Sequence, residues 1–198
     1  MPMIEAQTEL DAVNAMLLSI GQAPVSTLSV SGITDVNIAR KLLETAARRC
    51  LAKGWNFNTD DDYVITPDAN GFCLVPSGAL SVDSSNTSEN LVQRRAPNGS
   101  MCFYSKDAQS FLFNASITVK VIWGFAFEDL PEVARNYIAT YAGRRFQSRV
   151  IGSQILDRFE EEDERYAWVL LQTEERRSAD TNMFRRSPFL QSFGDRSY

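Results

Sequence analysis

Apolar residues recur at helical spacing near both ends of the chain and give way to short alternating runs in the middle. The first periodic segment predicts a helix over residues 9–20. Its apolar face is formed by Leu10, Val13, Leu17 and Ile20. Thr8 and Asp11 have the spacing of a capping box, in which two side chains satisfy free backbone amides at a helix start. Gly21 is expected to end the helix.

A second helix is predicted over residues 36–53. Its shared apolar face contains Val36, Ala39, Leu43, Ala46 and Cys50. Either Thr34 or Asp35 can cap the first turn. Gly54 occupies the position at which a helix commonly ends in a left-handed residue. The two segments therefore form one predicted helix pair.

Between residues 60 and 127 the apolar runs are short and are separated by Pro, Gly, Asn and Ser, a pattern typical of an antiparallel β unit. Strands are expected at 63–66, 72–75, 80–82, 91–94, 101–104, 111–113 and 117–123. The run Pro97-Asn98-Gly99 is a strong turn signal. In the last strand, apolar side chains alternate with an outward Lys120. We expect the acidic run Asp60-Asp61-Asp62 to be a loop that opens this region.

Helical spacing returns near Asp129. Asp129 and Glu132 again have capping-box spacing, with Pro131 in the first turn, where its missing N–H does no harm. We expect this third helix to end at Gly152 and a fourth helix to cover residues 154–177. The apolar positions of the fourth helix are Ile155, Leu156, Phe159, Tyr166, Ala167, Leu170 and Leu171.

The order of these elements predicts an α+β fold. Two helix pairs, in residues 1–58 and 128–177, are expected to pack as a four-helix bundle. An antiparallel β domain is inserted between them at residues 59–127, and residues 178–198 form an extended C-terminal tail.

The predicted tail alternates aromatic and arginine side chains, which are enriched in protein interfaces. These residues are Phe184, Arg185, Arg186, Phe189, Phe193 and Tyr198. We predict that the tail docks onto a neighbouring protein. The alternative is an ordinary frayed chain end.

Composition excludes several kinds of chemistry. The 198 residues carry a net charge of −5 and include no histidine, so Ser-His-Asp and Cys-His nucleophile schemes are excluded. Cys50, Cys73 and Cys102 do not fit a disulfide framework or a zinc site, and we expect buried thiols, no metal and no cofactor. A basic groove is missing, which disfavours a DNA-binding module. Neither a signal peptide nor a membrane span is recognisable.

Two acidic runs, residues 60–62 and 160–164, could serve a hydrolase with paired carboxylates or bind a divalent cation. In the second run, consecutive residues fan around a helix axis and do not converge. We therefore interpret it as a solvated face balanced by Arg158 and Arg165. Arginine doublets such as Arg144-Arg145 could pair with carboxylates of adjacent subunits, or be surface charge of little energetic effect.

The segment ELDAVNAMLLSIGQAPVSTL at residues 9–28 resembles the opening of the tail tubular protein A family of short-tailed bacteriophages. The similarity resumes at residues 54–58, GWNFN, after the second helix. In the third helix it includes Leu130-Pro131-Glu132, Tyr137-Ile138, Arg145-Phe146 and Gly152; in the fourth it includes Glu161-Glu162 and Ala167-Trp168. It extends over roughly residues 8–172, and the sequence after Thr173 departs from the family pattern.

The resemblance implies a structural virion protein that is not an enzyme. Members of this family form an adaptor ring, expected to be a dodecamer, that joins the portal protein to the tubular nozzle protein. Tail fibres attach near that junction, and genomic DNA passes through the lumen during ejection without sequence-specific binding. The implied localisation is the virion tail, after assembly in the host cytoplasm. The alternative function is a tail-associated polysaccharide or peptidoglycan hydrolase.

Overall fold

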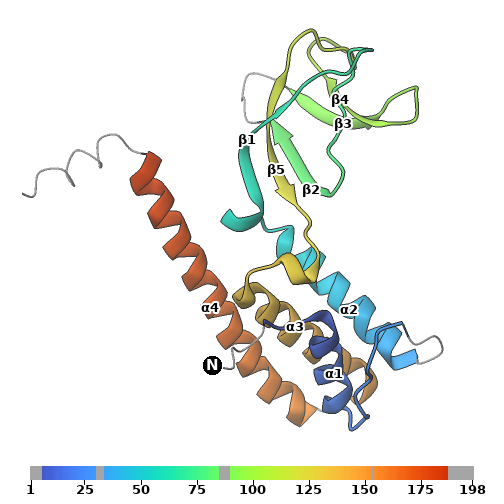
Figure 1. The fold of residues 1–198 in the computed structure, drawn as a ribbon, viewed down its shortest axis with the longest axis vertical. Coiled ribbons are helices and arrows are strands. Elements are labelled where there is room, and N and C mark those ends of the chain that lie inside the picture. The colour runs from blue at the N-terminus through green and yellow to red at the C-terminus, as the bar shows by residue number, and fades with distance from the viewer. Residues whose placement is uncertain (1–5, 30–33, 85–89, 153, 187–198) are drawn as a thin grey trace, which may run out of the picture. The chain divides into compact units, whose positions relative to one another are not determined.

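The chain forms two compact units in the computed structural model (Figure 1). The structure describes residues 6–29, 34–84, 90–152 and 154–186, with the backbone alone for 154–156 and 179–186. Leu51–Phe125 forms one unit, here called the β unit, and Met1–Cys50 with Ala126–Tyr198 forms the helical unit. The combination of helices and antiparallel sheets confirms the predicted α+β class. Within the described ranges, no helix has both the length and the apolar character needed to cross a membrane.

Helix α1 (Glu9–Ser19) begins at the capping box that the sequence predicts. The Asp11 amide donates a hydrogen bond to the Thr8 hydroxyl at 3.1 Å, and the Thr8 amide donates to the Asp11 carboxylate at 3.0 Å. The helix buries Ala12, Val13, Met16 and Leu17. The Asn14 side chain then fixes the extended segment that follows, because it exchanges hydrogen bonds of 2.8 and 3.0 Å with the backbone of Val25.

Helix α2 (Thr34–Leu51) starts before its predicted beginning, so Thr34 and Asp35 lie in its first turn and the prediction that one of them caps it is wrong. Its predicted apolar face is confirmed, since Val36, Ala39, Leu43, Ala46 and Cys50 are all buried. Gly54 follows with φ of +72°, and a Cβ atom there would lie 2.8 Å from Ile122 Cδ1. Both the backbone conformation and this close approach require glycine.

Helix α3 (Glu132–Val150) follows the short 3₁₀ helix η2 (Phe127–Asp129). Pro131 is its N-cap residue and no side chain caps the first turn, so the predicted capping box is wrong. The physical reason is a competing long-range contact: the Glu132 carboxylate accepts a hydrogen bond from the Gln7 amide at 3.2 Å. The inner face of α3 buries Ala134, Ile138, Ala142 and Phe146.

Helix α4 (Gln154–Arg186) continues beyond its predicted end at residue 177. Residues 178–186 are therefore helical and not part of an extended tail. This stretch contains neither Pro nor Gly, the residues that most strongly interrupt a helix. Helix α3 packs along α4, and α1 packs against α3. Helix α2 is joined to α1 by the ion pair of Arg40 with Glu9 at 3.1 Å, and to α3 by a hydrogen bond of Arg49 with Tyr141.

Two antiparallel sheets build the described part of the β unit. The strands are β1 (Thr59–Ile65), β2 (Ala79–Ser84), β3 (Leu91–Arg95), β4 (Met101–Ser105) and β5 (Ile117–Trp123). Strand β5 is the centre of a sheet with the order β1-β5-β2, while β3 and β4 form a hairpin. The core of the unit consists of Ile65, Cys73, Phe103, Ile117, Val119 and Val121. The predicted alternation in β5 is confirmed, with Lys120 exposed between buried valines.

Two predicted strands, at residues 72–75 and 111–113, do not form. Instead, isolated bridges join Phe72 to Leu112 and Leu74 to Cys102. The first segment is confined between Gly71, with φ of +82°, and Pro76, which has no N–H to donate to a ladder. The predicted turn at residues 97–99 is confirmed, because the Ala96 amide bonds the Ser100 carbonyl across it at 2.9 Å.

A buried asparagine joins three separate segments of the β unit. Asn58 ends the 3₁₀ helix η1 (Asn56–Asn58) and has no exposed surface. Its Oδ1 atom accepts a hydrogen bond from the Trp55 amide at 2.8 Å. Its Nδ2 atom donates to the carbonyl oxygens of Leu51 at 3.0 Å and Trp123 at 2.7 Å. The side chain thus fixes the last residue of α2 against the end of β5.

Candidate interaction surfaces

The acidic run Asp60-Asp61-Asp62 lies in strand β1, so the prediction of a loop is wrong. A register shift in β1 places the run opposite Lys120, and Lys120 pairs with Asp61 at 3.1 Å. Asp60 accepts a hydrogen bond from the Trp123 indole at 2.7 Å. These contacts explain the run as a charged, bulged sheet edge, a feature that discourages pairing with other strands. They leave no facing pair of carboxylates of the kind that glycoside hydrolysis requires.

The second acidic run surrounds one arginine between α3 and α4. Arg144 on α3 pairs with Asp157 at 2.8 Å, Glu161 at 3.4 Å and Glu164 at 3.1 Å on α4. The hydrogen bonds to Arg144 hold the pKa of Asp157 below its usual value, and those to Asp157 and Glu164 raise the pKa of Arg144. Among the described residues, Arg144 is therefore the cation that pairs with these acids, in place of the predicted Arg158 and Arg165. Its carboxylate contacts within the chain all lie on α4.

Glu160 is the remaining acid on the inner side of this run. Its Oε2 atom is buried without a hydrogen-bond partner. Burial, followed by the nearby charge of Asp157, raises the pKa of Glu160. A raised carboxyl pKa suits a general acid, but a hydrolase also needs a second carboxylate across a substrate. Asp157 is already held by Arg144, so the geometry supports a structural role for the cluster.

The tryptophans and cysteines contribute packing. Trp123 meets Tyr63 edge-to-face at 5.3 Å between ring centroids, and Trp168 lies 5.0 Å from Tyr137. The predicted burial of Cys50, Cys73 and Cys102 is confirmed, and all of them are free thiols. Burial raises the pKa of the Cys73 thiol to about 11. Among the described residues, no group of acids and cysteines is arranged to hold a metal ion.

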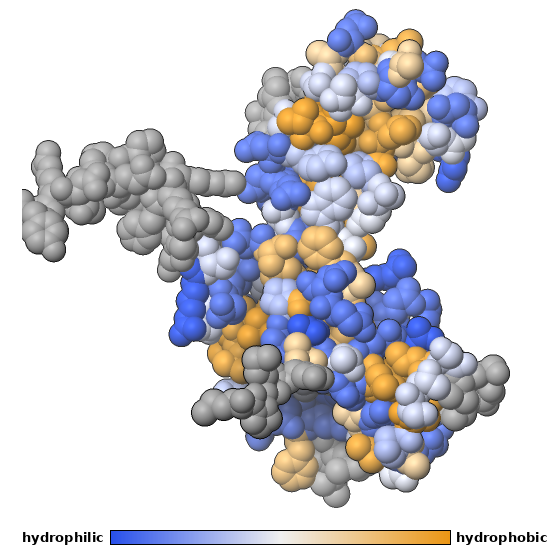
Figure 2. Space-filling model, in the orientation of Figure 1, coloured by the Kyte–Doolittle hydropathy of each residue, from blue (hydrophilic) through white to orange (hydrophobic). Residues whose placement is uncertain are grey.

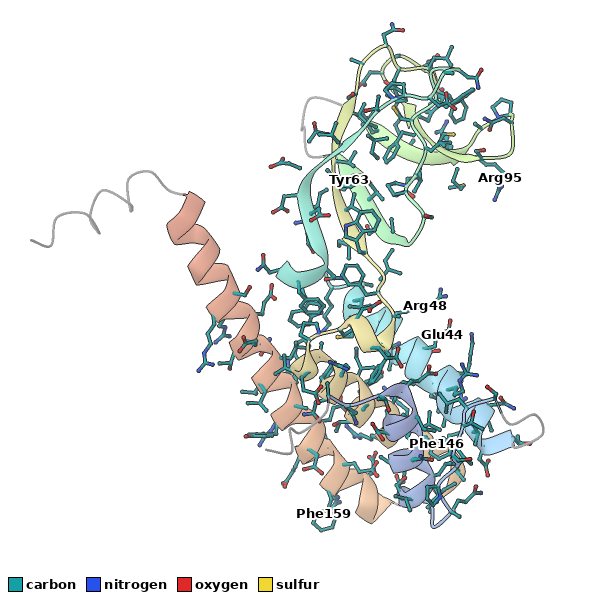
Figure 3. The ribbon with its side chains drawn as sticks, viewed as in Figure 1. Glu44, Arg48, Tyr63, Arg95, Phe146 and Phe159 are labelled. Carbon is teal, nitrogen blue, oxygen red and sulfur yellow. The ribbon has the colours of Figure 1, made fainter. Side chains whose placement is uncertain are left out.

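An exposed apolar stripe runs along the outer side of α4. We define the α4 stripe as Phe159, Tyr166 and Leu170, which are 66%, 67% and 37% exposed. Figure 2 shows apolar surface along this helix, and in Figure 3 Phe159 points away from the other helices. The predicted apolar positions of this helix also include Ala167 and Leu171, which are buried. At about 100° per residue the two sets lie roughly a quarter turn apart, so the helix has two apolar stripes.

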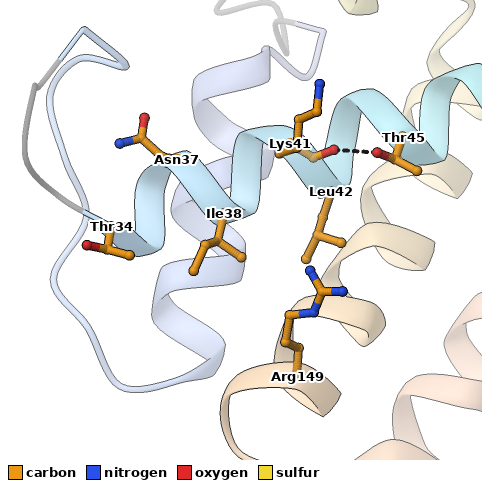
Figure 4. Close-up of a pocket in the computed structure, with 7 residues that line it drawn as sticks. All are labelled: Thr34, Asn37, Ile38, Lys41, Leu42, Thr45 and Arg149. Atoms are coloured by element: carbon orange, nitrogen blue, oxygen red, sulfur yellow. Dashed lines mark hydrogen bonds between the residues drawn. The ribbon is translucent and has the colours of Figure 1, made fainter.

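A groove lies along the outer face of α2. We define the α2 groove by its lining residues, Thr34, Asn37, Ile38, Lys41, Leu42, Thr45 and Arg149, which enclose about 470 Å³ (Figure 4). Ile38 and Leu42 are the apolar residues of this lining, and Lys41 and Arg149 are its cationic residues. No sequence motif marked this groove, because Arg149 is brought to it by the packing of α3.

The comparison with known families decides the identity of the chain. A family model described as "Tube: Tail tubular protein" matches residues 10–181. The chain belongs to the tail tubular protein family. A similar protein is tail tubular protein A of Klebsiella phage KP34, which is 29% identical over 164 residues, 82% of this chain and 84% of that relative. The resemblance seen in the sequence is confirmed, and this tail tubular protein is a structural component of a phage tail.

The residues matched by the family include some of the candidate surfaces and leave out others. The match contains the α4 stripe and the α2 groove but ends before the aromatic and arginine residues of the predicted docking tail. Phe184, Arg185 and Arg186 lie at the end of α4, and the structure describes their backbone only. The other predicted docking residues, Phe189, Phe193 and Tyr198, lie outside the described residues. The docking prediction therefore remains a prediction.

Proposed function

We propose that this chain is a subunit of an adaptor ring that joins the portal protein to the tubular nozzle of a short-tailed phage. The observation that carries the proposal is the match to the tail tubular family, which includes residues of both compact units. In this function the ring walls part of the channel through which DNA leaves the virion. The ring is expected to be a dodecamer, assembled in the host cytoplasm before it enters the virion tail.

The division of the chain suggests a division of roles. A closed ring uses the same contact between each pair of neighbours, so every subunit needs two different faces. The helical unit supplies rigid helices for this wall. The β unit, the C-terminal segment or both contact the portal, the nozzle and possible tail fibres. A net charge of −5 suits a channel wall along which DNA slides without being held.

A structural role also agrees with the contacts that the acidic residues make within the chain. Three carboxylates of the two acidic runs are held in contacts within the chain: Asp60 with Trp123, Asp61 with Lys120, and Glu164 with Arg144. Incubating the concentrated protein with host polysaccharide tests the alternative of a polysaccharide or peptidoglycan hydrolase. Release of reducing sugar that is lost in Glu160→Gln would favour the hydrolase.

The ring proposal is tested by mixing the purified chain with purified portal protein and imaging the mixture by electron microscopy. We expect an added ring on one face of the portal, to which the tubular nozzle protein then binds. Portal particles that remain bare at saturating concentrations of the chain would contradict the proposal. An unrelated ring-shaped protein in place of the portal is the control for non-specific adhesion.

The C-terminal residues are proposed to dock onto one of these partners. A chain stopped after Arg186 removes Phe189, Phe193 and Tyr198 and retains α4, so its fold should be unchanged. We expect this chain to bind portal or nozzle more weakly. Equal binding to both partners would remove residues 187–198 from the proposal. Replacing Phe184, Arg185 and Arg186 together by alanine tests the remaining part of the predicted docking set.

A further inference from the structure

The α4 stripe and the α2 groove face away from the interior of the helical unit on different helices. Helix α3 packs along α4, and α2 is joined to the other side of α3 through the contact of Arg49 with Tyr141. Figure 1 shows α4 and α2 on either side of α3. The chain therefore presents a protruding apolar surface on one side of the unit and a hollow surface on the other.

We propose that the α4 stripe of one subunit seats in the α2 groove of the next copy of this chain. This inference rests on the proposed ring function and names the contact that would close it. A contact between two different faces of identical chains is heterologous, and repetition of it produces a ring when the rotation between neighbours closes. The occupant of the groove is thus a second copy of the chain.

The two surfaces match in length and in polarity. The stripe extends from Phe159 to Leu170 and the groove from Thr34 to Thr45, which is about 16 Å of helix in each case. In this contact, apolar side chains of the stripe lie against Ile38 and Leu42 of the groove. Two aromatic residues bury on the order of 300–500 Å² together. A stable contact needs about 800 Å² on each partner, so the stripe is the centre of a larger interface.

The charges beside the two surfaces are opposite. Glu162 and Asp163 lie on the two sides of the α4 stripe, at about 40–60° from it around the helix, and both are exposed. Neither belongs to the carboxylate set that Arg144 holds. The groove carries the cationic side chain of Arg149 and that of Lys41, which also pairs with Glu44 of its own helix at 2.8 Å. Opposite charges on facing surfaces fix the register of a contact and exclude wrong partners.

Charge reversal provides a test that a change in folding cannot imitate. In one variant the groove is reversed with Lys41→Glu and Arg149→Glu, and in another the stripe flanks are reversed with Glu162→Lys and Asp163→Lys. A third variant contains all four substitutions. The matched control, Lys106→Glu with Arg176→Glu, makes the same change of charge at exposed positions outside both surfaces. Each protein is titrated against portal, and ring formation is measured by mass photometry and electron microscopy, with circular dichroism as the check on folding.

We expect each two-residue reversal to weaken ring formation by at least about tenfold, because every contact in the ring then brings like charges together. The four-residue variant should recover most of the loss, and the control should equal the wild type. Rings that form equally well with either reversal, or a four-residue variant weaker than both, would overturn the contact and leave the adaptor function standing. Stripe variants that form rings but fail to bind the nozzle would also overturn the contact, because the stripe would then face the nozzle. A wild-type chain that forms no ring on the portal would instead overturn the adaptor function together with this contact.

Discussion

Removing the Asn58 side chain should destabilise the β unit strongly, although the residue is polar and belongs to a short turn. Asn58→Ala removes the side-chain partner of the Trp55 amide and of the Trp123 carbonyl, while the Leu51 carbonyl keeps its hydrogen bond from the Gly54 amide at 3.0 Å. A buried polar group left without a hydrogen bond costs about 1–3 kcal/mol. Two such groups lead us to expect that the free energy of unfolding of the β unit falls by at least about 2 kcal/mol.

Urea denaturation followed by tryptophan fluorescence measures this change. Trp55 and Trp123 report on the β unit, and a Trp168→Phe background removes the signal of the helical unit. For an m-value of about 1–3 kcal/mol/M, the midpoint should move down by about 0.7–2 M. Asn70→Ala, at an exposed turn position of the same unit, is the matched control and should cost less than about 1 kcal/mol. A loss below about 1 kcal/mol for Asn58→Ala would refute the reasoning.

Asn58→Asp separates the hydrogen bonds from the shape of the side chain. The new carboxyl still accepts from the Trp55 amide, but it faces the carbonyls of Leu51 and Trp123 and is fully buried. Burial and these carbonyls raise its pKa in the folded state above the ordinary value of about 3.9. Its neutral form can donate a hydrogen bond, so the stability of the variant is greatest at acidic pH. That stability is lost as the pH rises through the raised pKa, whereas an unchanged difference from wild type between about pH 4 and pH 7 would contradict the assignment.

Three further predictions concern side-chain burial, a glycine turn and an ion pair. Phe146→Ala should lower the free energy of unfolding by about 3–5 kcal/mol, because Phe146 is fully buried. Phe159→Ala should change the free energy of unfolding of the isolated chain by less than about 0.5 kcal/mol, because Phe159 is exposed. Equal losses for the two variants in calorimetry would contradict this difference in burial. Gly54→Ala should lower the free energy of unfolding, measured by urea denaturation, by about 1–3 kcal/mol. The residue has a positive φ, and an added Cβ atom would lie too close to the Ile122 side chain. A neutral result would show that the turn relaxes. Arg144→Met should lower the thermal midpoint at pH 7, and the difference from wild type should shrink below about pH 4. The reason is that the pKa of Asp157 is lowered in the folded state, so the stabilisation is lost as that carboxylate takes up a proton. A difference that stays constant with pH would argue against the ion pair.

Local rules predicted the elements whose ends are set by neighbouring residues. The capping box of Thr8 and Asp11, the left-handed Gly54 and the turn at residues 97–99 each need only a few adjacent residues, and all three are confirmed. The capping box at Asp129 failed because Glu132 bonds Gln7, a residue far away in the sequence. The same limit applies to residues 60–62, which looked like a loop until pairing with β5 placed them in a sheet.

The sequence by itself determined the α+β class, the family of the chain and the apolar face of α2, because each depends on residue order and periodicity along a single segment. Only the tertiary structure decided that Arg144 gathers the acids of α4, that Asn58 joins Leu51 to the end of β5 within the β unit, and that Phe159 and Tyr166 remain exposed. Periodicity shows which side chains share a face of a helix. Which of two apolar faces meets a neighbour depends on how helices pack, and that is fixed by contacts between residues far apart in the chain.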